Sequence, residues 1–459
     1  MLWQITKKEI LANLQSLRFP ALVVISTALF LLNALLFAGR YEKELSSYSE
    51  RVTRNWDDRS TVTVTLERRP NVLEFCVAEG EKISSLNLKI GGLIEPILPE
   101  FGRNFTLPYF NRLDWVFIVK VLFSLFGIIL TFDAITGEKE RGTLTLICSN
   151  SISRAAILIG KYLGATFTLL IPLTMGMLLN LLILIRYLSI EHLPRIFGLV
   201  VFSVIYISLF VLLGLWISSS VHRSSTSLLV LLSIWMVLIV VIPNLAGMMT
   251  DYLDKTLSEY QLSRQWREIW KTEAEERVKR IDRQIKKGVF QTEEELRKAA
   301  LKKLSRIADL RIQWVERRNR SILAKRTYAR RLASISPAVS YQYACESLAN
   351  TGFIAQQRFL QAVKNYYPIY EDYVRAKVGE VVPYRGSFSF WLDFKGKQIY
   401  IRSPVPKAYQ GDMSDFPRFT EPEVPSRESV SSFDLTALLF WNLLLFLLAF
   451  LSFLRQDVH

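Results

Sequence analysis

Long apolar runs separated by charged stretches are the dominant pattern of the sequence. A helix that rises 1.5 Å per residue needs roughly 20 apolar residues to cross the ~30 Å hydrocarbon core of a bilayer. Six runs have this length and are predicted to be transmembrane helices: 19–38, 115–132, 162–185, 196–217, 226–249 and 433–454. The chain is therefore expected to be a mainly α-helical, polytopic membrane protein.

Polar residues within these runs have two interpretations each. Lys120 lies one to two turns inside the second run, where a lysine can reach the membrane surface, so we expect an interfacial anchor rather than part of an ion pathway. Asn180 and Asn442 are expected to form hydrogen bonds between helices, and a cargo path is the alternative.

Residues 1–18 place apolar side chains on one side and lysines elsewhere. This spacing predicts an interfacial helix along the cytoplasmic face of the membrane. The first apolar run is longer than the core of a signal peptide, and no small-x-small cleavage pattern closes it. We therefore interpret it as a retained span.

Lysines and arginines in the short loops set the orientation of the spans. With the N-terminus inside, nine of them lie in cytoplasmic pieces, whereas the short outer loop holds Arg195, with Arg186 at its edge. We expect a multi-pass protein of the cell inner or plasma membrane with both termini in the cytoplasm. The segment 133–161 and the tail 455–459 are then cytoplasmic, and the long segments 39–114 and 250–432 are extracytoplasmic.

The second outer segment is predicted to hold a helical hairpin over 251–335 and a mixed α/β part over 336–425. Apolar residues recur at helical spacing up to Gly288, and Thr292 with Glu295 forms a capping box for a second helix. Further helices are expected at 341–348 and 353–377, and a small strand hairpin at 388–401. The first outer segment is expected to hold some strands, around 62–64 and 72–75.

Composition and charge fit this division. Half of the 459 residues are hydrophobic, the mean hydropathy is +0.22 and the net charge is +15. Residues 251–331 hold 23 Lys and Arg against 13 Asp and Glu and so supply most of that charge. Because basic and acidic residues alternate around the helices, we interpret the hairpin as a solvated stalk and expect no nucleic-acid partner. Contact with anionic lipid headgroups or glycolipids is the alternative.

Motifs for metal or nucleotide chemistry are missing from the sequence. It contains no HExxH, no paired CxxC and no GxxxxGK[ST] loop, and the three histidines His192, His222 and His459 are predicted to lie too far apart to share a metal. The chain is therefore predicted not to be an enzyme and to hold no metal or cofactor itself.

Two weaker hypotheses concern the outer segments. Cys76 and Cys345 both lie there, which allows a disulfide without indicating one. The carboxylates Glu371 and Asp372 would be the site of a membrane-bound enzyme, but an acidic pair on a helix is usually a solvated face.

A charged, glycine-bounded stretch follows the second apolar run. Residues 136–146 read TGEKERGTLTL, and residues 153–164 read SRAAILIGKYLG. The first stretch predicts a short charged helix at the cytoplasmic surface. Such a helix can sit in a groove of another protein and pass on its rigid-body movement.

The two stretches resemble permease subunits of type-2 ABC exporters, in which an E-K-E-x-G-T-L coupling segment precedes an S-R-x-x-x-x-x-G-K-Y-L-G re-entry into the membrane. The matching residues are Glu138, Lys139, Glu140, Gly142, Thr143, Leu144, Ser153, Arg154 and 160–164. The six spans and the N-terminal helix extend the resemblance to the whole membrane portion. The insertion at 250–432 is similar to a subgroup with a large extracytoplasmic domain before the last span.

The resemblance implies a permease that couples ATP hydrolysis by a separate ATPase subunit to export of a substrate. It implies two permeases, identical or related, and two ATPase subunits that hold the ATP and magnesium. It assigns the ATPase contact to Glu138, Lys139, Glu140, Arg141, Gly142 and Thr143. The alternative is a non-transporting mechanotransducer or scaffold whose outer hairpin acts on a periplasmic or envelope partner.

Overall fold

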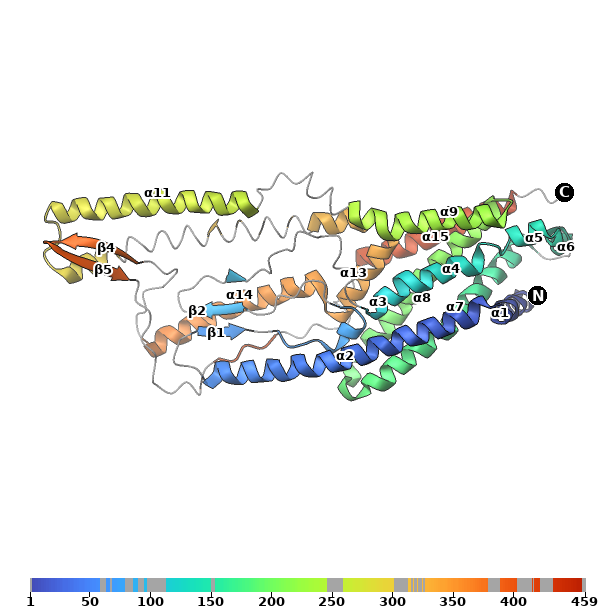
Figure 1. Cartoon of the computed structure of the whole chain (residues 1–459), viewed down its shortest axis with the longest axis horizontal. Helices are drawn as coiled ribbons and strands as arrows, with labels where there is room; N and C mark the ends of the chain where they lie inside the picture. Colours follow the sequence, from blue (N-terminus) through green and yellow to red (C-terminus); the bar gives the residue numbers. More distant parts are fainter. Residues whose placement is uncertain are drawn as a thin grey trace.

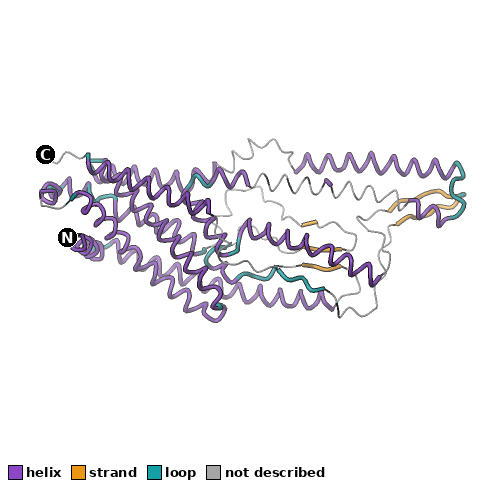
Figure 2. Tube along the Cα trace, turned by 180° about the vertical axis from the view of Figure 1, so that it is seen from behind, coloured by secondary structure: helices purple, strands orange, loops and turns teal. Residues whose placement is uncertain are grey.

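The molecule is elongated, with the apolar helices gathered at one end and the polar elements at the other (Figure 1). The computed structural model describes residues 2–57, 63–66, 68–78, 86–89, 95–96, 113–149, 153–245, 259–300, 327–378, 389–402, 417–421 and 432–455, with single residues at 313, 314, 317, 320, 324 and 415. Seen from behind, the strands are confined to the half of the molecule away from the helical bundle (Figure 2).

The described residues contain six helical stretches long and apolar enough to cross a membrane, which confirms the predicted fold class. In chain order they are α2 (Arg18–Asp57), the continuous α3, η3 and α4 (Trp115–Phe117, Ile118–Phe123 and Ser124–Thr131), α7 (Arg154–Leu184), α8 (Leu193–Ser220), α9 with η6 (Ser224–Met236 and Val237–Val241) and α15 (Ser432–Leu454). Both η3 and η6 are turns of π-helix, one in the second span and one in the fifth.

Helix α8 lies at the centre of the bundle, against α4, α7 and α15. Its sequence is apolar all round, as expected of a helix surrounded by other helices, and most of its side chains are buried. By contrast, α9 and η6 leave Leu229, Met236 and Val237 exposed, on a surface suited to lipid or to another membrane helix.

The asparagines inside the spans bond between helices, as predicted. Asn180 Nδ2 donates to Phe30 O at 3.0 Å and to Asn33 Oδ1 at 2.8 Å. Asn442 Nδ2 donates to Ile205 O at 3.0 Å. These amides join α7 to α2 and α15 to α8, so their hydrogen-bonding capacity serves packing.

The first outer segment differs from its prediction in two places. Helix α2 continues to Asp57, well past the predicted end of the first span. Residues 72–75 form the 3₁₀ turn η1 (Val72–Phe75) rather than a strand, because Asn71 accepts a hydrogen bond from Leu73 N and both Leu73 and Phe75 are buried. Strands β1 (Thr63–Leu66), β2 (Leu86–Lys89) and β3 (Glu95–Pro96) form an antiparallel sheet in that order, and Val62 lies outside the described residues.

The stalk begins with α11 (Glu259–Lys286), which ends before Gly288 at a φ of 68°. The predicted capping box then opens a helix over 293–300: Glu295 N donates to Thr292 Oγ1 at 3.3 Å, and Glu295 Oε2 accepts from Gln291 N at 3.0 Å. Ion pairs between residues four positions apart, such as Arg264 with Glu268, lie along the exposed surface of α11. They support the solvated-stalk interpretation. Most of the returning leg, from 301 to 326, lies outside the described residues.

The remaining outer elements are α13 (Pro337–Ala349), α14 (Gly352–Val378) and the antiparallel pair β4 (Ser389–Phe394) and β5 (Lys397–Arg402). The helices and the strand hairpin confirm the elements predicted there. One face of the hairpin packs on the far end of the stalk, in a small core of Ile281, Leu296, Ala300, Leu392, Phe394 and Ile399.

Candidate functional site

The charged stretch after the second span folds into two short helices at the end of the bundle that also holds α1 (Leu2–Gln15) and the last turn of α15 (Figure 1). These are α5 (Thr136–Glu140) and α6 (Thr143–Ser149), joined by Arg141 and by Gly142 at a φ of 69°. A positive φ is tolerated by glycine without strain, which explains a glycine at this joint. Ser218 of α8 holds the start of α5 by accepting from Ile135 N at 3.0 Å and Thr136 N at 3.1 Å.

Glu138 points inward, into a buried ion-pair cluster. Lys161 Nζ of α7 donates to Glu138 Oε1 at 2.7 Å and to Glu9 Oε1 of α1 at 2.9 Å. Only 4% of the Lys161 side chain is exposed, so its charge depends on these two carboxylates. One lysine therefore ties α1, α5 and α7 together.

Lys139 and Glu140 cap the two helices of the neighbouring hairpin. Lys139 Nζ donates to Ser219 O at 2.6 Å and Val221 O at 2.9 Å, at the C-terminal end of α8. Glu140 accepts from Ser224 N and Ser224 Oγ, both at 2.8 Å, at the N-terminus of α9. Each charge has the sign that the adjacent helix terminus favours.

The remaining predicted residues lie on the outer surface of this segment. Arg141, Gly142, Thr143, Thr145 and Leu146 are exposed, and we call this set the coupling surface. Leu144 is buried beneath it, whereas 68% of Leu146 is exposed. The structure thus divides the six predicted contact residues into three that hold the segment in place and three that face outward.

A further ion pair fixes the end of the second span and was not predicted. Arg18 at the start of α2 donates to Asp133 Oδ1 at 3.0 Å and Oδ2 at 2.8 Å, and also to Ile129 O at 3.0 Å. Bidentate pairing of this kind fixes orientation as well as distance. In the sequence the only signal was an arginine directly before one span and an aspartate directly after the next.

The stretch over 153–164 is explained by contacts with its neighbours. Ser153 caps α7 by accepting from Ala156 N, and Arg154 Nη1 donates to Leu454 O at the end of α15, at 2.7 Å. The two glycines let α1 lie directly on α7, because a Cβ atom on Gly160 would lie 2.6 Å from Ile5 Cγ2 and one on Gly164 would lie 2.6 Å from Glu9 Cβ.

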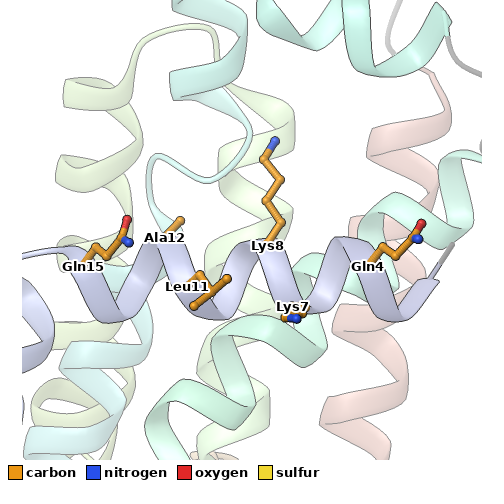
Figure 3. Close-up of a pocket in the computed structure, with 6 residues that line it drawn as sticks. All are labelled: Gln4, Lys7, Lys8, Leu11, Ala12 and Gln15. Carbon is orange, nitrogen blue, oxygen red and sulfur yellow. The ribbon is translucent and has the colours of Figure 1, made fainter.

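The opposite face of α1 borders a surface depression of about 500 Å³ (Figure 3). Its lining residues are Gln4, Lys7, Lys8, Leu11, Ala12 and Gln15. The polar groups among them are two lysines and two glutamines, which can hold an anionic or hydrogen-bonding group. They supply no hydroxyl or thiol nucleophile and no carboxylate for acid–base chemistry.

The weaker candidates take structural positions. His192 Nδ1 lies 2.7 Å from Ser189 Oγ in a turn, and no group of metal-ligating side chains occurs among the described residues. Asp372 is exposed on α14, and the side chain of Glu371 lies outside the described part. Cys76 and Cys345 are free and buried, so the disulfide is not formed, and burial raises the pKa of both thiols well above the usual value.

The anchor interpretation of Lys120 is wrong. The side chain does not reach the membrane surface but is buried, with 8% of the residue exposed, and its Nζ donates to Gln342 Oε1 of α13 at 3.0 Å. Helix α13 packs over the outer end of the bundle and so turns an interfacial position into an interior one.

Six spans that hold a short helical segment at one end define a multi-pass membrane protein. The model of the ABC-2 family transporter protein matches residues 3–458, and the chain belongs to this family. Members of the family lack ATPase domains and bound cofactors of their own and work with ATPase subunits. No match to the chain is found among curated proteins.

Proposed function

We propose that the chain is the permease subunit of an ATP-binding cassette exporter of the subgroup with a large extracytoplasmic domain. In this proposal, two permease copies, identical or related, pair with two ATPase subunits that bind ATP and magnesium. Both termini and the coupling surface face the cytoplasm, where the ATPase subunits lie, and a substrate moves outward through the inner or plasma membrane.

The bonds that the charged residues of α5 form with neighbouring helices are the observation that supports this proposal most directly. Glu138, Lys139 and Glu140 fasten α5 to α1, α7, α8 and α9, so a force on the coupling surface reaches four elements together. When ATP closes the ATPase dimer, the two coupling surfaces are displaced together and the spans repack. The ATP-bound ATPase must bind the two arrangements with different free energies for this to occur.

The coupling surface can be tested separately from the residues that hold it. Leu146→Glu places a charge on the exposed surface, and we expect recovery of the ATPase with tagged permease to fall about tenfold, as for loss of a central interface contact. Leu17→Glu is the matched control, since Leu17 is 90% exposed in the turn between α1 and α2. Undiminished ATPase recovery with Leu146→Glu would contradict the assignment.

The mechanotransducer is a second candidate, and it is favoured by α13, which joins the spans directly to the outer elements. The two functions differ in what stimulates ATP hydrolysis. A transporter complex in liposomes is stimulated by its substrate, whereas a mechanotransducer retains an envelope partner on purification and is stimulated by that partner.

A further inference from the structure

A chain of buried polar side chains connects the second span to the outer domain. Lys120 Nζ, on the π-helical turn η3, donates to Gln342 Oε1 at 3.0 Å, and Gln342 Nε2 donates to Glu346 Oε1 at 3.0 Å. Both charged residues at the ends of this chain are only 8% exposed. Gln342 and Glu346 lie one turn apart on α13, so the helix itself continues the connection outward.

The inner side of α13 is held by the spans. Tyr341 stacks on Tyr206 of α8 with ring centroids 4.5 Å apart, and its hydroxyl lies 2.8 Å from Ser203 Oγ. Tyr206 in turn donates to Lys120 O at 3.1 Å. Helix α13 is thus linked to the π-helical turn of the second span directly, through Gln342, and indirectly, through Tyr206 of α8.

The N-terminal end of α13 meets the other π-helical turn. Ser336 Oγ, at the N-cap of α13, donates to Leu238 O in η6 of the fifth span. Single turns of π-helix inside α-helices are frequently found at functional sites. In the described part of the chain both such turns border α13.

The outer side of α13 is held by both outer segments. Asn71 Nδ2 donates to Ala349 O and Arg68 Nη2 donates to Asn350 O, each at 2.7 Å, at the C-terminal end of α13. These bonds satisfy carbonyl groups that a helix end leaves unpaired. The first outer segment is thereby fixed to α13.

Arg330 connects the returning stalk leg to the same helix. Its guanidinium lies 4.3 Å from the centre of the Tyr343 ring of α13, and it donates to Asp434 Oδ2 at the start of the sixth span at 2.9 Å. The Asp434 side chain is 2% exposed, so this pair is also interior. The stalk, α13 and the sixth span therefore share one buried contact.

We propose that Lys120, Gln342 and Glu346 are positioning residues that transmit movement of the second span through α13 to the stalk. The inference rests on the proposed function, since it needs ATP-driven movement of the spans. Separating Lys120 from Gln342 removes a hydrogen bond from a buried ammonium group, which is unfavourable. The second span and α13 are thus expected to move as one body.

The test uses the complete complex with its ATPase and two pairs of spin labels within one chain. Ile190→Cys with Lys279→Cys reports on the stalk relative to the outer loop of the bundle. Ser149→Cys at the end of α6, outside the coupling surface, with Leu17→Cys reports on the coupling segment. All four positions are exposed. Cys148 is replaced by Ser, and the buried Cys76 and Cys345 are retained. Label distances are measured by pulsed electron paramagnetic resonance with and without trapped ATP.

We expect trapped ATP to shift both distances in the parent chain. In Lys120→Met and Glu346→Leu the coupling-segment shift should persist, while the stalk shift falls by about half or more. Glu346→Gln still accepts from Gln342 and should keep both shifts, as should Lys287→Met, which removes an exposed lysine at the far end of the stalk. If Lys120→Met does not fold, Gln342→Met breaks the same connection.

An unchanged stalk shift in Lys120→Met and Glu346→Leu would overturn the inference. So would a parent chain whose coupling segment moves while its stalk does not, or a Lys120→Met variant that loses both shifts equally, which would indicate a purely structural role. Absence of the coupling-segment shift in the parent would instead overturn the proposed function, and this inference with it.

Discussion

Buried charges at the two ends of the bundle are held by partners far away in the sequence. Lys161 is paired with Glu9 and Glu138 near the coupling segment, and Lys120 is hydrogen-bonded to Gln342 at the outer end. Breaking such a pair costs about 3 to 5 kcal/mol, because the remaining charge stays buried. These residues specify how elements meet rather than providing chemistry.

Ionisation of the buried Glu346 carboxyl should make the stability of the protein depend on pH. Burial raises the pKa of its carboxyl to about 7, against the lowering effects of the Gln342 hydrogen bond and the charges of Arg330 and Lys120. Because the folded state binds the proton more tightly than the unfolded state, this residue's favourable contribution is complete below a pH of about 4.5 and is lost as the pH rises to about 7.

Glu346→Gln replaces the carboxyl by an amide of similar shape that does not ionise, so the stability lost on ionisation is retained. We expect the variant to be more stable than the parent at pH 8, by on the order of 3 kcal/mol, and nearly equal to it at pH 4.5. Thermal unfolding in detergent at both pH values measures the difference. A stability gap that does not change with pH would contradict the pKa of the carboxyl.

At the scale of elements, close packing of α1 on α7 decides how the coupling segment is supported. The contact needs glycine at 160 and 164, since any side chain there meets Ile5 or Glu9. The hydrogen bonds and ion pairs between α1 and α7 can form only because these glycines allow the two helices to approach closely. The packing of α1 is therefore as important for the site as the charges are.

Gly160→Leu should push α1 away from α7. We expect a loss of about 1 to 3 kcal/mol in stability, as for overpacking in other interiors. Faster tryptic cleavage at Lys7 and Lys8 would report release of α1. Gly39→Leu is the matched control, because a Cβ atom on Gly39 of α2 meets nothing within 4 Å. Equal cleavage rates in the two variants would show that the close contact does not hold α1.

At the scale of the whole molecule, six spans put α1 and the end of α15 on one side and the stalk on the other (Figure 1). The loop basic residues favour the cytoplasm for the terminal side. The stalk must then be accessible from the extracytoplasmic side of the membrane, and the coupling surface only from the cytoplasm.

Lys287→Cys at the far end of the stalk and Thr145→Cys on the coupling surface test this topology in a Cys148→Ser chain. In intact cells, a membrane-impermeant maleimide should label residue 287 and leave residue 145 unlabelled until the membrane is opened. Both residues are exposed in the chain itself, so when it is expressed without the ATPase their access depends on the membrane alone. Labelling of residue 145 in intact cells, with 287 protected, would reverse the orientation.

Local patterns were sufficient for much of the architecture. Run length predicted the six spans, alternation predicted β4 and β5, and the spacing of Thr292 and Glu295 predicted a helix start. These features depend on residues close together in the chain, so they can be recognised from the sequence alone. The same holds for the short charged helix α5, whose residues are contiguous.

The tertiary structure alone decided which polar residues became interior. Lys120 was predicted to lie at the membrane surface and Asp434 was not singled out, yet both are buried because α13 and the stalk cover the outer end of the bundle. Likewise, only the positions of α7, α8 and α9 show that Glu138, Lys139 and Glu140 bond to these helices. The sequence by itself determined the spans and the short charged helix α5. Burial and pairing instead depend on what packs over a residue, and for Lys120 that is set by a part of the chain 222 positions away.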